Sequence, residues 1–167
     1  VEPVLLGRSD LAELRTVIQD WQRRQRLADE QQMFERYRYF TVQLNNVGAH
    51  RVATVTVTNP PVNALNERAL DELTVVVEHL SRRDDVAAVV FTGQGTASFV
   101  AGADIRQLLE DIRSLDEARA LPNNAHLAFR KIERMGKPCI AAIQGVALGG
   151  GMEFALACHW RIAEPTA

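Results

Sequence analysis

The pattern of apolar and polar positions divides the chain into a helical first section and a second section in which strands and helices alternate. In the first section, apolar residues recur at steps of three and four, as on one face of a helix. This stripe consists of Leu11, Leu14, Ile18 and Trp21. Ser9 or Asp10 can cap the start of the helix, which continues to about Arg36. We therefore predict an N-terminal helical arm or linker over residues 1–38 that packs on a neighbour, followed by a core over residues 39–167.

The core begins with the alternation that is typical of a β-hairpin. Residues 39–44 are rich in strand-forming side chains, and residues 51–58 alternate between Val or Ala on one side and Thr on the other. The turn between them is marked by Asn45, Asn46, Gly48 and His50. Pro60 and Pro61 end the second strand because proline cannot donate to a strand ladder.

A helix and an apolar strand follow the hairpin. Asn66 caps a helix over about residues 67–81, whose apolar positions fall on one face. Residues 86–91 are continuously apolar, which is typical of a strand buried on both faces in a sheet covered by helices. This order of elements predicts an α/β fold built from β–α crossover units.

Two further helices are predicted before the last buried strand. The first covers about residues 105–113 and the second about residues 116–135. We expect Pro122 to break the second helix near its start and Gly136 to end it. The apolar run 139–143 then indicates a buried strand.

A triple glycine after this strand offers the first candidate for chemistry. Residues 149–151 are all glycine and lead into a short apolar helix over residues 154–158, so a ligand can approach the backbone closely. Glu153 is the only charged residue between Lys137 and Arg161. We expect its carboxylate to be buried among the apolar residues of that helix, where it needs a partner or a function.

A second loop of small residues follows the earlier apolar strand. Ala101, Gly102 and Ala103 lie at a strand end, where α/β sheets bind ligands, and Asp104 caps or begins the next helix. By itself the loop fits a ligand site and a tight structural loop equally well. Backbone amides from two such loops can converge on one oxygen as an oxyanion hole, and a nearby carboxylate can act as general acid or base. Together they predict enolate chemistry on an activated acyl group.

Composition narrows the classes of protein that fit this pattern. With 167 residues, 47% of them apolar, the chain is long enough for one soluble domain. Its net charge of −2 predicts no nucleic-acid partner, and no apolar run is long enough to cross a membrane. Cys139 and Cys158 lie in apolar runs and are interpreted as reduced core residues. A cytoplasmic protein is the default prediction, with an organelle as the alternative.

Other kinds of site find no support in the sequence. The four histidines are scattered and the cysteines form no Cys-x-x-Cys pair, so we predict no metal site. The chain has no phosphate-binding loop that ends in Gly-Lys-Ser or Gly-Lys-Thr, and no dinucleotide-binding Gly-x-Gly-x-x-Gly. The Gly-x-Ser-x-Gly motif of a serine nucleophile is also absent.

Three motifs together resemble the enoyl-CoA hydratase/isomerase (crotonase) family. They are Asn-Pro-Pro-Val-Asn-Ala-Leu at 59–65, Phe-Val-Ala-Gly-Ala-Asp-Ile at 99–105, and Ile-Gln-Gly-Val-Ala-Leu-Gly-Gly-Gly-Met-Glu-Phe at 143–154. The resemblance extends from about Tyr39 to the end and leaves residues 1–38 outside. It implies a spiral of repeated ββα units, here truncated before its C-terminal helices. It also implies an acyl-CoA thioester substrate, with coenzyme A as part of the substrate and no separate cofactor.

The resemblance assigns roles to single residues. The backbone N–H groups of Ala103 and Gly150 would form the oxyanion hole for the thioester carbonyl. Glu153 would hold and activate the added water as the first of two catalytic glutamates. The substrate would be lined by Ala101, Gly102, Ala103, Asp104, Ile105, Arg106, Gly149 and Gly150.

One feature of the hydratases is missing from these residues. Their second glutamate lies in a Phe-Gly-x-Pro-Glu segment that would follow the point where this chain stops, and Glu164 precedes a proline without that motif. The chain also starts at Val1 without a methionine, so we expect a trimmed or processed product. We assign no catalytic role to Glu164.

The resulting prediction is an enoyl-CoA hydratase that adds water to a trans-2-enoyl-CoA and forms a trimer or dimer of trimers when full length. Another crotonase-type reaction (isomerase, hydrolase or ring-cleaving lyase) and a non-catalytic assembly fragment are the alternatives. The glycines at 149–151 could also serve only close helix–strand packing, and Glu153 could be a structural carboxylate.

Overall fold

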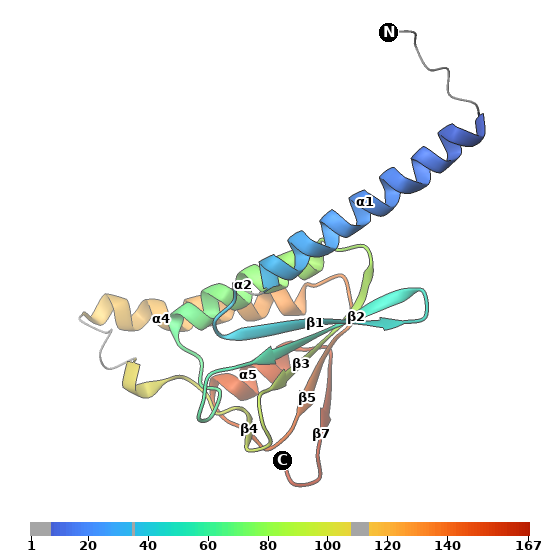
Figure 1. Cartoon of the computed structure of the whole chain (residues 1–167). Coiled ribbons are helices and arrows are strands. Elements are labelled where there is room, and N and C mark those ends of the chain that lie inside the picture. The colour runs from blue at the N-terminus through green and yellow to red at the C-terminus, as the bar shows by residue number, and fades with distance from the viewer. Residues whose placement is uncertain (1–7, 35, 108–113) are drawn as a thin grey trace. The chain divides into compact units, whose positions relative to one another are not determined.

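The computed structural model describes residues 8–34, 36–107 and 114–167, and the chain forms two units, Val1–Arg36 and Tyr37–Ala167. Within its described residues, the first unit forms one long helix, α1 (Arg8–Phe34), drawn in blue in Figure 1. It ends two residues before the predicted Arg36, but it begins at Arg8, so Ser9 and Asp10, the predicted caps, lie inside the helix. The side chains of its apolar stripe are exposed, with fractions between 42% for Leu14 and 61% for Trp21.

The second unit is an α/β layer structure around one five-stranded sheet, in the order β1-β2-β3-β5-β7. The strands are β1 (Phe40–Val47), β2 (His50–Val57), β3 (Val86–Gly93), β5 (Cys139–Ile143) and β7 (Trp160–Ala163). β1 pairs antiparallel with β2, and every other neighbouring pair in this sheet is parallel. The predicted α/β class is therefore confirmed.

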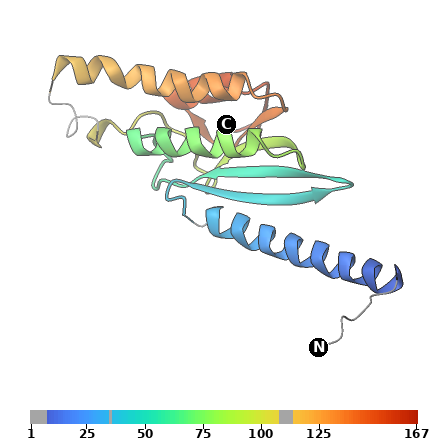
Figure 2. The ribbon, with the colours of Figure 1, turned by 90° about the horizontal axis from the view of Figure 1, so that it is seen from above.

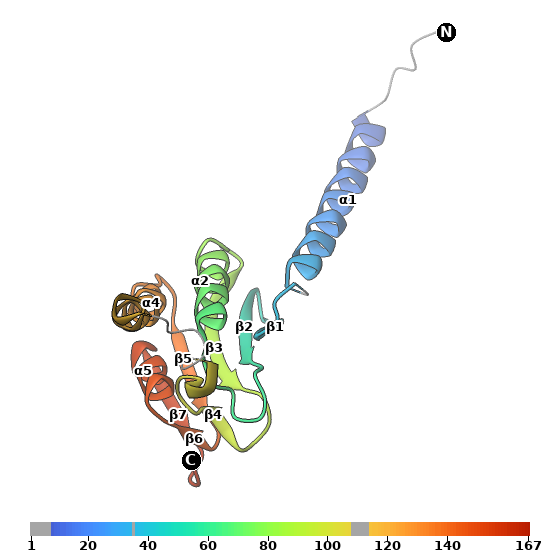
Figure 3. The same ribbon diagram turned by 90° about the vertical axis from the view of Figure 1, so that its left-hand side faces the viewer.

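Three helices lie on one side of this sheet (Figure 3). They are α2 (Glu67–Ser81), α4 (Leu115–Glu133) and α5 (Gly150–Ala157), and α2 and α4 run side by side (Figure 2). A second, two-stranded parallel sheet consists of β4 (Ser98–Val100) and β6 (Val146–Ala147). This small sheet lies near the carboxyl end of β3, where the candidate site is found.

Burial along β3 differs from the prediction of a strand covered on both faces. Val89 and Phe91 are fully buried, whereas Val90 and Thr92 are half-buried and Ala87 is exposed. The prediction is wrong because α2, α4 and α5 of the second unit all lie on one side of the sheet (Figure 3). The apolar residues on the other face are only partly shielded, so a continuous apolar run does not prove two-sided cover.

The hairpin turn is tighter than the sequence suggested. Val47 pairs with His50, which leaves only Gly48 and Ala49 between the strands. Gly48 has φ = 59°, a backbone conformation that glycine adopts readily. Asn45, predicted in the turn, lies in β1, and its side-chain amide donates to Thr54 Oγ1 across the ladder at 3.0 Å. Cross-strand pairing thus extends both strands into the polar residues.

The helix α2 follows its local signals closely. Its bounds match the predicted 67–81, and Asn66 Oδ1 accepts a hydrogen bond from the Ala69 amide at 2.8 Å. The predicted stripe is buried and consists of Leu70, Leu73, Val77 and Leu80. Lys137 Nζ donates to the carbonyl of Leu80 at 2.8 Å, which satisfies a carbonyl at the helix end.

The helix α4 contradicts the predicted break at Pro122, because the helix is continuous from Leu115 to Glu133. Proline removes one helical hydrogen bond and costs about 3 kcal/mol in a helix interior. The C-terminal half of α4 compensates by packing: Ala128 and Ile132 are fully buried, and the Phe129 ring stacks on Phe154 at 5.7 Å between centroids. The earlier predicted helix is described only from 105 to 107, and its residues 108–113 lie outside the described residues.

Phe154 of α5 lies at the centre of the core below the candidate site. Its ring contacts those of Phe91 in β3 and Phe99 in β4, with centroid distances of 5.1 and 5.6 Å. Together with the Phe129 contact, these rings join α4, α5, β3 and β4 in one apolar cluster. The position of α5, and with it the triple glycine at its start, is therefore determined by core packing.

Candidate functional site

The site is built where the two small-residue loops meet. The small sheet joins them, because Ser98 pairs with Val146 and Val100 pairs with Ala147. The ladder continues past the strands, where the Leu148 amide donates to the Val100 carbonyl at 3.1 Å. Loops that are about 45 residues apart in the sequence thus run side by side.

The backbone at Ala103 leaves its amide outside the local ladder. Ala103 forms an isolated parallel bridge with Leu65. In this bridge the Leu65 amide donates to the Gly102 carbonyl at 2.8 Å, and the Asp104 amide donates to the Leu65 carbonyl at 2.9 Å. Parallel pairing therefore uses the groups on either side of the Ala103 N–H, which points away from Leu65.

The Gly150 amide comes close to this position from the second loop. Gly150 is the first residue of α5, so its N–H has no acceptor within the helix. A Cβ placed on Gly150 would lie 4.0 Å from the Ala103 nitrogen, and a Cβ placed on Gly102 would lie 3.8 Å from the Gly150 nitrogen. The structure thus brings together the two amides that the sequence singled out, at the start of a helix where the dipole favours negative charge.

The three glycines of the turn have different structural roles. Gly149 adopts φ = 48° and ψ = −121°, which side chains disfavour, and Gly151 packs so tightly that a Cβ would lie 1.9 Å from the Val100 carbonyl oxygen. At Gly150, the nearest described atom outside its helix would be 4.0 Å from a Cβ. Close packing therefore explains Gly151 but leaves Gly150 open toward the Ala103 amide.

Glu153 is exposed, so the predicted burial of its carboxylate is wrong. The helix α5 buries Phe154, Ala155 and Ala157 against the core, and its opposite face carries Glu153 together with Met152 and Leu156. Apolar composition suggested burial on most sides, but packing covers only one face of the helix. Glu153 lies three residues after Gly150, a spacing that places two helical residues on neighbouring positions of the surface.

The remaining predicted binding residues extend from the first loop into the next helix. Asp104 is the N-cap, because its Oδ1 accepts a hydrogen bond from the Gln107 amide at 3.2 Å. Ile105 and Arg106 are exposed, and Ile105 has 67% of its surface exposed. The Ala101 amide donates to the Val62 carbonyl at 3.1 Å, so it is not available to a ligand.

The motif at 59–65 contributes a residue that the sequence analysis did not single out. Asn63 is 2% exposed and has φ = 55°. Its side-chain amide donates to the carbonyls of Gln94 and Ser98, in the segment that leads into β4. A buried amide aimed at a neighbouring loop could have been suspected from the motif, but its acceptors are more than 30 residues away.

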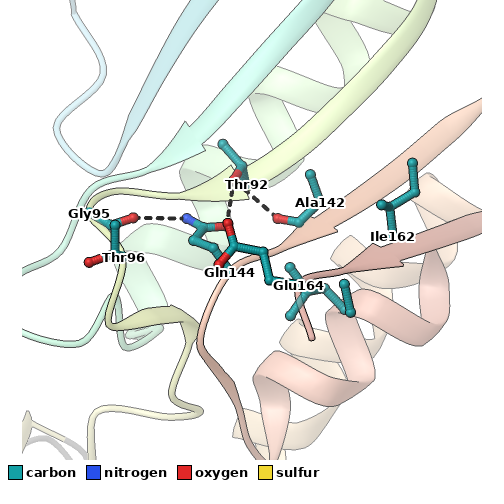
Figure 4. A pocket seen from close by; sticks show the side chains of 9 residues that line it. Thr92, Gly95, Thr96, Ala142, Gln144, Ile162 and Glu164 are labelled. Atoms are coloured by element: carbon teal, nitrogen blue, oxygen red, sulfur yellow. Dashed lines mark hydrogen bonds between the residues drawn. The ribbon is translucent and has the colours of Figure 1, made fainter. Parts of the chain in front are cut away.

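An open pocket of about 360 Å³ lies at the carboxyl ends of β3, β5 and β7 (Figure 4). It contains none of the predicted site residues. The Thr92 hydroxyl donates to Gln144 Oε1 at 2.8 Å, and Gln144 Nε2 donates to the carbonyls of Gly93 and Gly95. The side chains of Thr92 and Gln144 are therefore already paired within the protein. Glu164 lines the same pocket, and its backbone amide donates to the Ile143 carbonyl at 3.0 Å.

The two thiols belong to the core. Cys139 and Cys158 are free and buried, as predicted, and burial raises the pKa of each thiol to about 12. Within the described ranges, no group of three or more His, Cys, Asp or Glu side chains is arranged to hold a metal ion. The described helices include none that is long and apolar enough to cross a membrane.

The second unit is an α/β domain with a mixed sheet, helices on one side and two adjacent loop amides. Comparison with known proteins identifies its family. Residues 48–167 match the family model of enoyl-CoA hydratase/isomerase, and the chain belongs to this family. The chain is 42% identical over 130 residues to a short-chain-enoyl-CoA hydratase of Clostridium acetobutylicum, covering 75% of this chain and 49% of the relative. It is 40% identical over 116 residues to a probable enoyl-CoA hydratase of Bacillus subtilis, covering 70% and 44%.

Solved structures give the same result for the fold. An enoyl-CoA hydratase from Bacillus anthracis superposes with a TM-score of 0.68 at 29% identity, covering 75% of this chain and 48% of that one. A putative enoyl-CoA hydratase from Streptomyces coelicolor gives a TM-score of 0.65 at 34% identity, covering 78% and 46%. The predicted crotonase-like fold is therefore confirmed, and the chain spans about half the length of the relatives it matches.

Proposed function

We propose that the protein is an enoyl-CoA hydratase, which adds water across the double bond of a trans-2-enoyl-CoA. The observation that carries this proposal is the approach of the Ala103 and Gly150 amides from two separate loops. The names of the relatives at about 40% identity support hydration over other reactions of acyl-CoA thioesters. Because the chain spans about half of these relatives, the proposal concerns the intact protein.

In the proposed mechanism, the two amides bind the thioester carbonyl oxygen as it gains negative charge. Addition of a water oxygen to the β-carbon of the enoyl group converts the thioester into an enolate. The negative charge of this enolate resides on the former thioester carbonyl oxygen. Fixed donors stabilise the developing charge more than the neutral substrate, and loss of one such donor costs about 10²–10³ in kcat. The start of α5 adds a favourable dipole.

Glu153 is proposed as the general base that orients the water and takes its proton. Its exposure leaves it accessible to water, and its position three residues after Gly150 places it close to the proposed oxyanion hole. The α-carbon of the enolate must then receive a proton from an acid. We propose that this acid is a second glutamate outside residues 1–167, since Glu164 lacks the surrounding motif. The Ala101–Arg106 segment and Gly149 would line the coenzyme A and acyl path.

The test is hydration of crotonyl-CoA by the intact protein and its Glu153→Gln variant. Removal of a general base typically lowers turnover about 10²–10⁴-fold, and we expect a loss in that range with little change in stability. Glu133→Gln is the matched control, because Glu133 is also an exposed helical glutamate but lies in α4. Normal turnover in Glu153→Gln would contradict the role given to this residue.

Other reactions of the family are the second candidate. Products formed from a panel of acyl-CoA thioesters would distinguish hydration from isomerisation, hydrolysis and ring cleavage. Hydration without the other products is the expected result. A product from which coenzyme A has been released, or in which only the double bond has moved, would replace the proposed reaction.

We also propose that the intact protein forms a homo-oligomer, a trimer or dimer of trimers, and works in the cytoplasm. The family resemblance supports the oligomer, and the exposed stripe of α1 is a candidate surface for assembly. Sedimentation velocity of the protein with and without residues 1–36 tests the role of α1. If the sedimenting particle contains the same number of subunits after the deletion, α1 is excluded from assembly. The two free thiols are compatible with a reducing compartment.

A further inference from the structure

The segment 62–65 holds the loop that carries Ala103. The Val62 carbonyl accepts the Ala101 amide at 3.1 Å and the Ser98 hydroxyl at 2.6 Å. Further along the chain, Leu65 forms the bridge described above with Ala103. Each of these contacts joins 62–65 to the chain between 98 and 104, so the position of the loop depends on this segment.

Asn63 is the only residue of this segment whose side chain is both polar and buried, with 2% of its surface exposed. Its Nδ2 donates to the Gln94 carbonyl at 3.0 Å and to the Ser98 carbonyl at 2.9 Å. Its Oδ1 accepts the Asn59 amide at 3.3 Å. All three partners are backbone groups. The Asn63 side chain therefore links the main chain at Asn59 to the main chain at Gln94 and Ser98.

The Ser98 carbonyl lies at the start of β4, directly before the loop that leads to Ala103. Without the Asn63 amide, two carbonyls in a partly or fully buried setting would lose a donor, and each such loss typically costs about 1–3 kcal/mol. The chain would relieve this cost by moving the 94–98 segment toward water. Because β4 also pairs with β6, such a movement changes the spacing between the two loops.

We propose that Asn63 is a positioning residue for the oxyanion hole, which fixes the Ala103 amide relative to the Gly150 amide through Ser98 and β4. This inference rests on the proposed function, in which both amides bind an acyl carbonyl. A misplacement of about 1 Å is enough to lower the rate of a catalytic site about 10²-fold. Loss of the Asn63 hydrogen bonds, which we call the Asn63 brace, is therefore expected to have a large effect on the rate. Asn63 itself touches no substrate in this proposal.

Two substitutions remove the brace in different ways. Asn63→Gly deletes the side chain and keeps a residue that tolerates φ = 55°. Asn63→Asp keeps the size and also tolerates this conformation, but replaces the donor by a carboxylate oxygen that repels both carbonyls. Val77→Ala is the control, because Val77 is buried in α2 and its truncation lowers stability without removing a hydrogen bond.

The readout is the carbonyl stretching frequency of bound butyryl-CoA, labelled with ¹³C at the thioester carbon and measured by infrared difference spectroscopy on the intact protein. Butyryl-CoA has no double bond to hydrate, so the signal reports hydrogen bonding to the carbonyl alone. Wild-type protein and Val77→Ala should shift the band to lower frequency. Both Asn63 variants should lose most of that shift while their dissociation constants stay within about threefold, because most of the coenzyme A contacts remain.

The possible outcomes separate this inference from the proposed function. A wild-type shift that persists in both Asn63 variants would overturn the inference and leave the proposed function intact. Loss of the shift in Val77→Ala as well, or failure of both Asn63 variants to fold by circular dichroism, would show a general stabilising role and also overturn it. A wild-type protein that binds butyryl-CoA without any shift, or does not bind it, would contradict the oxyanion hole itself and the inference with it.

Discussion

Adjacent glycines at the start of α5 give a direct test of how the site is built. A Cβ on Gly151 would lie 1.9 Å from the Val100 carbonyl oxygen and 2.7 Å from its carbon. Real Cβ atoms essentially never approach closer than 3.0 Å, so the Gly151→Ala variant must move the Val100 backbone or α5 by about 1 Å. A Cβ on Gly150 meets no described atom outside its helix closer than 4.0 Å.

The two substitutions should therefore differ strongly in their effect on stability. Overpacking typically costs about 1–3 kcal/mol, and we expect the upper end for Gly151→Ala because the obstacle is backbone held in the β4–β6 ladder. Replacement of a helical glycine by alanine stabilises the helix by about 1 kcal/mol. The free energy of unfolding of Gly151→Ala should therefore fall by about 2 kcal/mol in total. Gly150→Ala should change the free energy of unfolding by less than about 1 kcal/mol.

Urea unfolding followed by circular dichroism measures both effects. With a slope of about 2 kcal/mol per molar urea, Gly151→Ala should lower the unfolding midpoint by about 1 M at an unchanged slope, whereas Gly150→Ala should stay close to wild type. Under the proposed function, Gly150→Ala should instead lower turnover, because its methyl group enters the space beside the Ala103 amide. Equal midpoints for the two variants would refute the assignment of separate roles.

Four further measurements test the fold and the thiols. Asn66→Ala should lower the free energy of unfolding by about 1 kcal/mol in urea because it removes the cap of α2, and Asn66→Ser, which retains a cap, should recover most of this loss. Phe154→Ala should cost about 3–5 kcal/mol in the same assay because three other rings contact Phe154; a loss below 1 kcal/mol would contradict its central position. Cys139 and Cys158, each with a pKa of about 12 against an ordinary 9.0, should react with a disulfide reagent at pH 8 about 10³-fold more slowly in native protein than in urea. Since the unfolded chain releases these protons near pH 9 and the folded protein holds them until about pH 12, the free energy of unfolding should fall as the pH rises through this window, and the urea midpoint at several pH values measures it.

Local chemistry was sufficient to predict several elements from the sequence. The bounds of α2 follow from an Asn cap and a regular apolar stripe, and those of β5 follow from an apolar run between Pro138 and Gln144. The paired small-residue loops were also recognisable, because glycine and alanine expose the backbone wherever the fold places them. Each of these predictions depends on residues within about four positions of one another.

The tertiary structure decided the features that depend on distant residues. Pro122 remains inside a helix because core packing after it outweighs one missing hydrogen bond. Glu153 is exposed because the core covers only one face of α5. The sequence could not show which glycine packs and which stays open, since the Val100 carbonyl and the Ala103 amide that distinguish Gly151 from Gly150 are about 50 residues away. Those contacts arise only once β4 and β6 pair, and this pairing turns two separate small-residue loops into one candidate site.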